Sequence, residues 1–135
     1  MPIKPGQLRI LYHDGHYVAV DKPAGLLVHR SRIDGRRTRF ALQMVRDQIG
    51  PKVYPVHRLD RPTSGVLLFA LSPESAQKLA QAFAEKRVSK TYLAVVRGYT
   101  EELGIIDSPL TRDANAPKKN QEARPSRTDY RRLAT

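Results

Sequence analysis

The chain lacks cysteine and tryptophan altogether, and histidine is scarce, with four residues among 135. Without cysteine the protein can form no disulfide, thiolate nucleophile or cysteine-based zinc site. The four histidines are scattered, and none forms a pair at metal-ligand spacing. Long apolar runs are also missing, which excludes a transmembrane helix, and the N-terminus has no apolar stretch of the signal-peptide type. We therefore expect a cytoplasmic protein without metal or cofactor.

Acidic residues are few compared with basic ones: 13 Asp and Glu stand against 24 Lys and Arg, which gives a net charge of +11. Such an excess is typical of proteins that bind a polyanion, most often a nucleic acid. An anionic membrane surface is the alternative, but the sequence shows no basic amphipathic helix with a strong apolar face. The length fits one domain, and 40% apolar with 27% charged residues is compatible with a folded core.

Two strands and a helix are predicted in the first 50 residues. Leu8–His13 and Tyr17–Lys22 are strand-like, and the turn signal Asp14-Gly15 separates them. Phe40–Ile49 carries apolar residues at helical spacing, and Gly50-Pro51 after it would end a helix.

The second half of the chain adds strands around one further helix. Val66–Leu71 is an uninterrupted apolar run, which is typical of a strand buried on both faces. Ser72-Pro73-Glu74 begins a helix that should end near Arg87 and cover the sheet with its apolar side. Lys90–Gly98 and Ser126–Thr135 show the alternation of strands. Together these elements predict an α+β fold with a mixed, largely antiparallel sheet and packed helices.

The polar loop before the run Val66–Leu71 places one carboxylate, Asp60, between the guanidinium groups of Arg58 and Arg61. A carboxylate kept ionised by charge pairing can act as a nucleophile or a base. It can equally be structural, because aspartate often accepts backbone N–H groups in a turn. The residues alone leave both interpretations open. No G-x-S-x-G elbow surrounds Ser64 in this loop. His57 and Ser64 are therefore interpreted as turn and capping groups.

Arginine and aromatic residues provide two further hypotheses. The segment Arg30–Arg39 carries five arginines and one aspartate, and we favour a phosphate-contacting arm over a solvated loop because arginine dominates. Tyr92 can be a core aromatic or a platform on which a flipped base stacks, and composition does not decide between them. The predicted RNA-binding side chains are Arg30, Arg32, Arg36, Arg37, Arg39, Arg61 and Lys90.

Three motifs carry a resemblance to a known family. AVDKPAG at 19–25, HRLDRPTSG at 57–65 and KTYLAVVRG at 90–98 resemble, in this order, the motifs of the RluA-type pseudouridine synthases. The resemblance implies an enzyme that isomerises a uridine within RNA. It breaks the glycosidic C–N bond and rejoins the base to the ribose through carbon 5, and it uses no metal or cofactor.

The resemblance also implies roles for single residues. Asp60 matches the family's essential aspartate, which either attacks ribose C1′ or takes a proton from C2′. Arg58 matches the arginine that pairs with this aspartate and helps to hold the extruded nucleotide. Tyr92 matches the tyrosine that packs on the target base. These roles agree with the chemistry open to an ionised carboxylate, an aromatic platform and a basic surface.

Shorter pieces of the sequence point to the RNA substrate. VHRS at 28–31, VRDQIG at 45–50 and HRLDRPTSGVLL at 57–68 are most similar to the branch of this family that modifies tRNA. The resemblance therefore implies tRNA as the partner, with ribosomal RNA as the alternative.

The sequence departs from the family pattern at its end. Residues 99–135 contain no match to the later G-R-x-H-Q-[IL]-R-like motif, which supplies a basic residue facing the catalytic aspartate. We therefore expect residues 1–135 to be the N-terminal part of a catalytic domain, with 111–125 as a flexible loop and a final strand that lacks partners. A truncated RNA-binding remnant without isomerase activity is then a further alternative.

Overall fold

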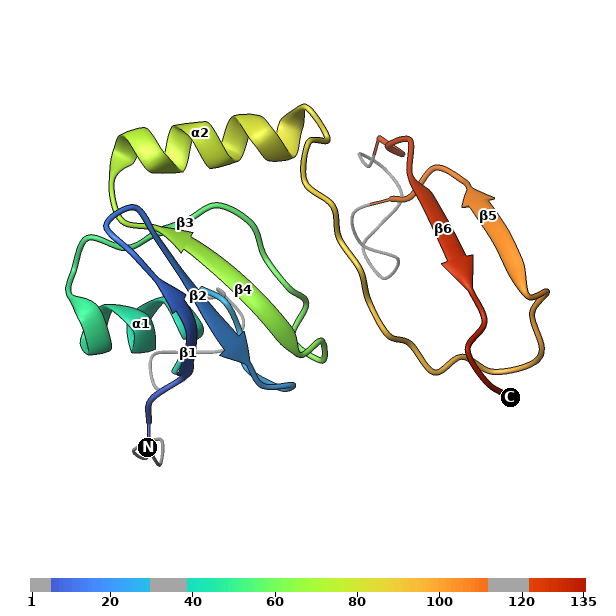
Figure 1. Cartoon of the computed structure of the whole chain (residues 1–135), viewed down its shortest axis with the longest axis horizontal. Coiled ribbons are helices and arrows are strands. Elements are labelled where there is room, and N and C mark those ends of the chain that lie inside the picture. Colours follow the sequence, from blue (N-terminus) through green and yellow to red (C-terminus); the bar gives the residue numbers. More distant parts are fainter. Residues whose placement is uncertain (1–5, 30–38, 112–121) are drawn as a thin grey trace. The chain divides into compact units, whose positions relative to one another are not determined.

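The computed structural model describes residues 6–29, 39–111 and 122–135. The chain divides into two compact units, Met1–Lys90 (unit 1) and Thr91–Thr135 (unit 2), each with its own antiparallel sheet. The predicted α+β class is confirmed. The elements are β1 (Arg9–His13), β2 (Tyr17–Lys22), α1 (Ala41–Ile49), β3 (Tyr54–Pro55), β4 (Gly65–Ala70), α2 (Pro73–Ala84), β5 (Leu103–Asp107) and β6 (Arg127–Arg131) (Figure 1).

Unit 1 is built on an antiparallel sheet in the order β1-β2-β4-β3. The β1–β2 hairpin turns at Asp14, whose carboxylate accepts the backbone N–H groups of His16 and Tyr17, each at 2.7 Å. The Tyr12 hydroxyl donates to the same carboxylate at 2.6 Å. These donors, Tyr12 foremost, lower the pKa of Asp14 to about 2. The turn predicted at Asp14-Gly15 is therefore confirmed.

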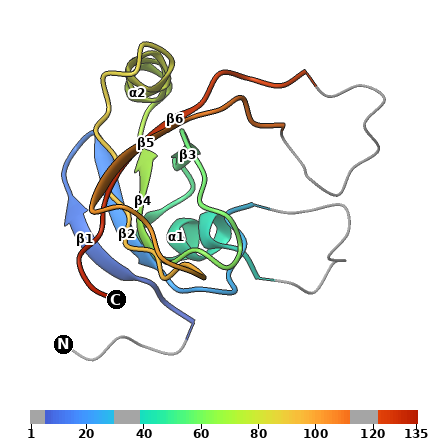
Figure 2. The same ribbon diagram turned by 90° about the vertical axis from the view of Figure 1, so that its right-hand side faces the viewer.

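Alternation along β2 and β4 directs one face of this sheet towards α1. In the antiparallel register Val18 pairs with Phe69 and Val20 with Leu67, and all four side chains are buried. Figure 2 shows α1 lying against one face of the sheet. The helix completes the core with Ala41, Leu42 and Val45. Burying such side chains removes apolar surface from water and is the main stabilising contribution in unit 1.

Both predicted helices are present. α1 ends at Gly50, whose φ of 119° lies in the region that favours glycine. α2 begins after Ser72, whose hydroxyl accepts the N–H of Ser75 at 3.1 Å, and it ends at Ala84, slightly earlier than predicted. The prediction that α2 covers the sheet is wrong in extent, because Ala80 is exposed and only Ser75 of the helix is buried. α2 packs mainly on β3 and β4, so its apolar side is only partly covered.

The prediction that Val66–Leu71 is buried on both faces is confirmed only in part: Ala70, which shares a face with Val66, is buried, but the start of that face is not. Leu67 and Phe69 face the core, but Val66 points to the opposite face and is 61% exposed. Val66 pairs with Asp21, whose carboxylate lies 3.5 Å from a guanidinium nitrogen of Arg9. The face of the sheet opposite the core is therefore polar and exposed at this end.

Unit 2 contains the antiparallel pair β5–β6. The strand predicted at Ser126–Thr135 is confirmed as β6. The expectation that it lacks partners is wrong, because it pairs with β5, which was not predicted. Gly104 of β5 lies under the ring of Tyr130, and a Cβ at this position would collide with that ring. Of the predicted loop 111–125, residues 112–121 lie outside the described chain. Leu110 and Arg124 pair on either side of it through two hydrogen bonds of 2.9 Å.

The prediction of a strand at Lys90–Gly98 is wrong. The segment enters no ladder among the described residues, and every residue from Thr91 to Tyr99 is exposed. The side chain of Leu93 is 86% exposed and that of Val95 is fully exposed. Alternation gives a segment the side chains of a strand, but its N–H and C=O groups also need a neighbouring strand to bond.

Candidate active site

Asp60 lies on the loop between β3 and β4, at the end of the sheet where β2 finishes and β4 begins. Leu59 is buried and anchors this loop in the core. The Asp60 carbonyl accepts the N–H of Thr63 at 3.0 Å, which closes a turn around Pro62. Gly65 then enters β4 with a φ of 125°.

The carboxylate of Asp60 lies beside the guanidinium of Arg58, with 3.7 Å between Oδ1 and Nη2. The two side chains are 77% and 61% exposed, respectively. Ion pairs this exposed contribute only about 0–1 kcal/mol to stability, so the pair does not hold the loop in place. The structure brings the two predicted side chains together and leaves the carboxylate accessible to a large substrate. Its position is set by the backbone beneath it.

Lys22 is the main support of that backbone. Its side chain is fully buried, and Nζ donates to the carbonyls of Pro23, Leu26 and Arg61 at 3.0, 2.7 and 3.2 Å. A lysine ammonium has three N–H donors, so these three acceptors satisfy it. Burial lowers the pKa of Lys22, while the charge of Asp60 acts in the opposite direction. Lys22 therefore fixes the residue that follows Asp60.

Sequence reasoning did not include Lys22 in the site, although a signal was present. Val18, Val20 and Lys22 alternate on the core-facing side of β2, so a charged residue stands at a position where the pattern requires an apolar one. A charge at such a position must be paired or hydrogen-bonded within the fold. Its partners could not be predicted, because they are backbone carbonyls from two separate loops.

Arg61 and Gly25 join the two motif-bearing loops directly. The N–H of Gly25 donates to the Arg61 carbonyl at 2.7 Å, and Arg61 Nε donates to the Gly25 carbonyl at 3.1 Å. Gly25 has a φ of 87°, which favours glycine here. The stretches AVDKPAG and HRLDRPTSG therefore lie side by side. The part of Arg61 in RNA binding stays a prediction, and the structure adds a contact that holds the loop.

The other predicted residues belong to other segments or lie outside the described chain. Tyr92 belongs to unit 2 and is 59% exposed, whereas Lys90 and Arg39 are exposed residues of unit 1. Four predicted RNA-binding residues lie outside the described chain: Arg30, Arg32, Arg36 and Arg37. Unit 1 thus supplies the Asp60–Arg58 pair, and Tyr92 comes from a different unit.

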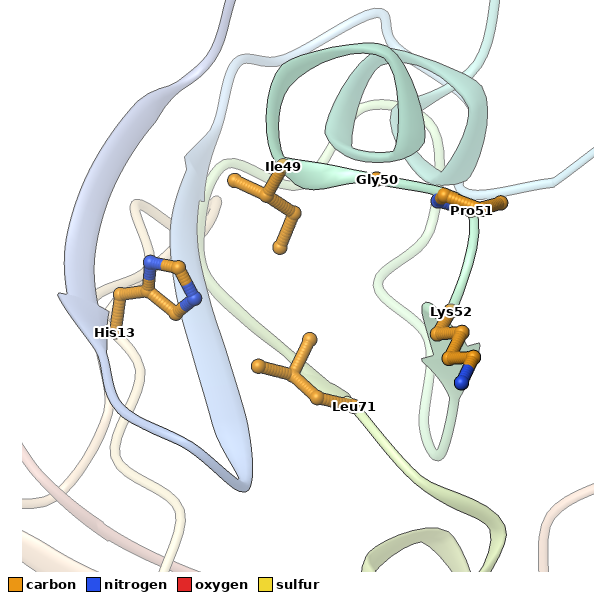
Figure 3. A pocket seen from close by; sticks show the side chains of 6 residues that line it. All are labelled: His13, Ile49, Gly50, Pro51, Lys52 and Leu71. Carbon is orange, nitrogen blue, oxygen red and sulfur yellow. The ribbon is translucent and has the colours of Figure 1, made fainter.

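A hollow of about 270 Å³ occurs at the other end of the sheet of unit 1 (Figure 3). Its lining consists of His13, Ile49, Gly50, Pro51, Lys52 and Leu71. At that end Tyr17 pairs with Ala70, whereas Lys22 pairs with Gly65 near Asp60, so the hollow is separate from the loop. Within the described ranges there is no group of three or more His, Asp or Glu side chains that could hold a metal ion. The described part of the chain also contains no helix that is long and apolar enough to cross a bilayer.

The arrangement offers an accessible carboxylate next to a cation, on a loop fixed by buried contacts. Such a carboxylate can attack an electrophilic carbon or accept a proton. Because the loop is held by backbone hydrogen bonds, the carboxylate needs little reorganisation before it meets a substrate.

Comparisons with known proteins agree with these motifs. Residues 16–135 match the family model described as RNA pseudouridylate synthase. A protein of Vibrio parahaemolyticus named tRNA pseudouridine synthase C is 51% identical over 135 residues, which cover 96% of this chain and 55% of that protein. A protein of the same name from Haemophilus influenzae is 55% identical over 131 residues, with coverage of 93% and 55%. The chain thus spans about half the length of these relatives.

Solved structures show the same fold. The structure titled Human RNA Pseudouridylate Synthase Domain Containing 1 has a TM-score of 0.70 and 26% sequence identity, covering 96% of this chain and 53% of that one. The structure titled Human RNA Pseudouridylate Synthase Domain Containing 4 has the same TM-score with 24% identity, covering 94% and 54%. The second likeness concerns the fold alone.

Proposed function

The chain belongs to the RNA pseudouridylate synthase family, and from this premise we propose that it converts a uridine of tRNA to pseudouridine in the cytoplasm. The observation that carries the proposal is the Asp60 loop, in which an accessible carboxylate lies 3.7 Å from Arg58 on a backbone fixed by Lys22. The names of the relatives from Vibrio parahaemolyticus and Haemophilus influenzae support tRNA as the substrate.

In this proposal the reaction is an isomerisation that gains and loses no atoms. Asp60 either attacks ribose C1′ and is displaced again when C5 bonds to that carbon, or removes a proton from C2′ and returns it after C5 has bonded. The bond between C1′ and N1 of uracil breaks, the base turns, and a bond forms between C1′ and C5. The proton on C5 is then lost and N1 regains one. Arg58 holds the nucleotide next to the carboxylate by charge and hydrogen bonds.

The target base must leave its stack to reach Asp60, and this requires an aromatic surface that receives it. Tyr92 is the proposed surface, and its exposed ring is available for stacking. The net charge of +11 supports binding to the RNA backbone. The proposed phosphate contacts are Arg30, Arg32, Arg36, Arg37, Arg39, Arg61 and Lys90.

The test is to incubate the chain with uridine-labelled tRNA and ribosomal RNA fragments and to measure pseudouridine. We expect product from tRNA with the wild-type chain and none with Asp60→Ala. Asp47→Ala is the matched control, because Asp47 is an exposed aspartate on α1. Equal product from wild type and Asp60→Ala would contradict the role of Asp60. Product from ribosomal RNA alone would contradict the substrate.

A second candidate is RNA binding without turnover. The observation in its favour is the net charge of +11, which supports binding to an RNA backbone without requiring turnover. Tight, salt-sensitive binding of tRNA without any pseudouridine would support this candidate over the enzyme.

A further inference from the structure

His57 occupies an unusual place at the edge of the sheet. β3 pairs with β4 through two residues only, Tyr54 with Ala70 and Pro55 with Phe69. Beyond Pro55 the backbone leaves the sheet, and the His57 side chain takes over: its Nε2 accepts the N–H of Leu68 at 2.9 Å. An imidazole thus satisfies a backbone donor that a longer β3 would otherwise bond.

The ring of His57 is also held from its flat side. It stacks on Phe83 of α2, with 4.9 Å between the ring centroids and 19° between the planes. One side chain therefore connects the loop, β4 and α2. His57 stands next to Arg58 in sequence, so these contacts fix the backbone where the Asp60 loop begins.

The hydrogen bond to Leu68 requires a neutral imidazole. Nε2 can accept only without its own proton, so the proton of the neutral ring lies on Nδ1. Burial, and then the positive charge of Lys90, lower the pKa of His57 from its ordinary value of 6.5. Among the described groups packed around the ring, β4 carries no ionisable side chain and α2 meets it through the uncharged Phe83. Lys90 is the charged group that acts on it.

We propose that His57 is a positioning residue that holds the Asp60 loop ready for reaction only while its imidazole is neutral. The inference rests on the proposed function and adds a residue to it. Lys22 and Gly25 hold the loop after Asp60, and His57 holds it before Arg58. Protonation of His57 puts a hydrogen on Nε2, so that two N–H donors face each other and the hydrogen bond from Leu68 is lost. The start of the loop is then released while Lys22 still holds its end.

Two variants separate the hydrogen bond from the ring contact. His57→Phe keeps the stacking on Phe83 and removes the acceptor, whereas His57→Gln keeps an acceptor that does not titrate. His16→Gln is the matched control, because His16 is an exposed histidine whose side chain is not used in this contact. Amide hydrogen exchange of Leu68 and pseudouridine formation are measured for each protein between pH 5 and 8.

We expect His57→Phe to speed exchange at Leu68 at least tenfold and to lower kcat about tenfold with little change in KM. We expect His57→Gln to restore protection and turnover in large part. Wild type should lose turnover as the pH falls through the pKa of His57, which burial places below its ordinary value of 6.5, and His57→Gln should lack that step. His16→Gln should behave as wild type.

Unchanged protection of Leu68 in His57→Phe, or the same acid step in His57→Gln and wild type, would overturn the proposal. If His57→Phe does not fold, exchange at Leu68 across the imidazole titration of the wild-type chain decides the question. If wild type makes no pseudouridine, the proposed function fails. Exchange at Leu68 and the NMR signals of Arg58 and Asp60 then decide whether His57 holds the loop.

Discussion

The two units of the chain use similar β-type sequences with different results. In unit 1 the side chains of β2 and β4 are buried against α1, and Val18, Val20, Leu67 and Phe69 have no exposed surface. In the described part of unit 2 no residue is buried, and Leu93, Val95 and Ile105 are largely exposed. The difference shows that an apolar alternation becomes a packed strand only where a second layer covers it. The Asp60 loop lies on the unit that has such a layer.

The largest effect should come from removing a core side chain. Phe69→Ala in β4 should lower the free energy of unfolding by about 3–5 kcal/mol, because the substitution leaves a cavity in the packed core of unit 1. Ile105→Ala in β5 is the matched change in unit 2 and should cost less than about 0.5 kcal/mol, since this side chain is 57% exposed. Urea unfolding followed by circular dichroism gives both values. Similar losses from both changes would abolish the distinction between the units.

The next largest effect should come from Lys22. Lys22→Met removes three N–H donors and leaves the carbonyls of Pro23, Leu26 and Arg61 without that partner. The carbonyls of Arg61 and Pro23 keep the N–H groups of Gly25 and Leu26, so the loss comes mainly from the Leu26 carbonyl. We expect the free energy of unfolding to fall by about 1–3 kcal/mol. Lys52→Met is the control, because Lys52 is exposed at the other end of the sheet. Urea midpoints that differ little between the two variants would show that the ammonium does not support the loop.

The smallest effect should come from the exposed segment of unit 2. Val95→Ser replaces a fully exposed apolar side chain and should change the free energy of unfolding by no more than about 0.5 kcal/mol. It should, however, reduce self-association in sedimentation experiments, since contiguous exposed apolar surface promotes association. A large loss of stability would mean that Val95 is packed in solution and that unit 2 has a core of its own.

The elements that could be predicted from the sequence are those with local signals. The turn at Asp14, the end of α1 at Gly50 and the cap of α2 at Ser72 each depend on residues within a few positions. β5 was missed, and 90–98 was predicted wrongly, because strand pairing depends on partners far away in the chain. The paired residues of β5 and β6 lie 20 to 28 positions apart, from Asp107 with Arg127 to Leu103 with Arg131.

The candidate site divides in the same way. Asp60 and Arg58 could be found in their motif, and the structure places them next to each other. The contacts of Lys22 and His57 that support their loop could not be predicted from the sequence. They arise from the register of β2 and β4 and from the shortness of β3. The alternation of Val18, Val20 and Lys22 marks the lysine as exceptional without giving its partners.

Residue-resolved amide hydrogen exchange of the whole chain tests most directly whether unit 1 alone provides a preformed, packed support for Asp60. We predict that the amides of β2 and β4, with those of Gly25 and Thr63 in the loops, exchange only when unit 1 unfolds. The amides of Thr91–Tyr99 should exchange close to the rates of an unstructured peptide. Equal protection of Thr91–Tyr99 and β4 would contradict the account, as would free exchange at Gly25 and Thr63.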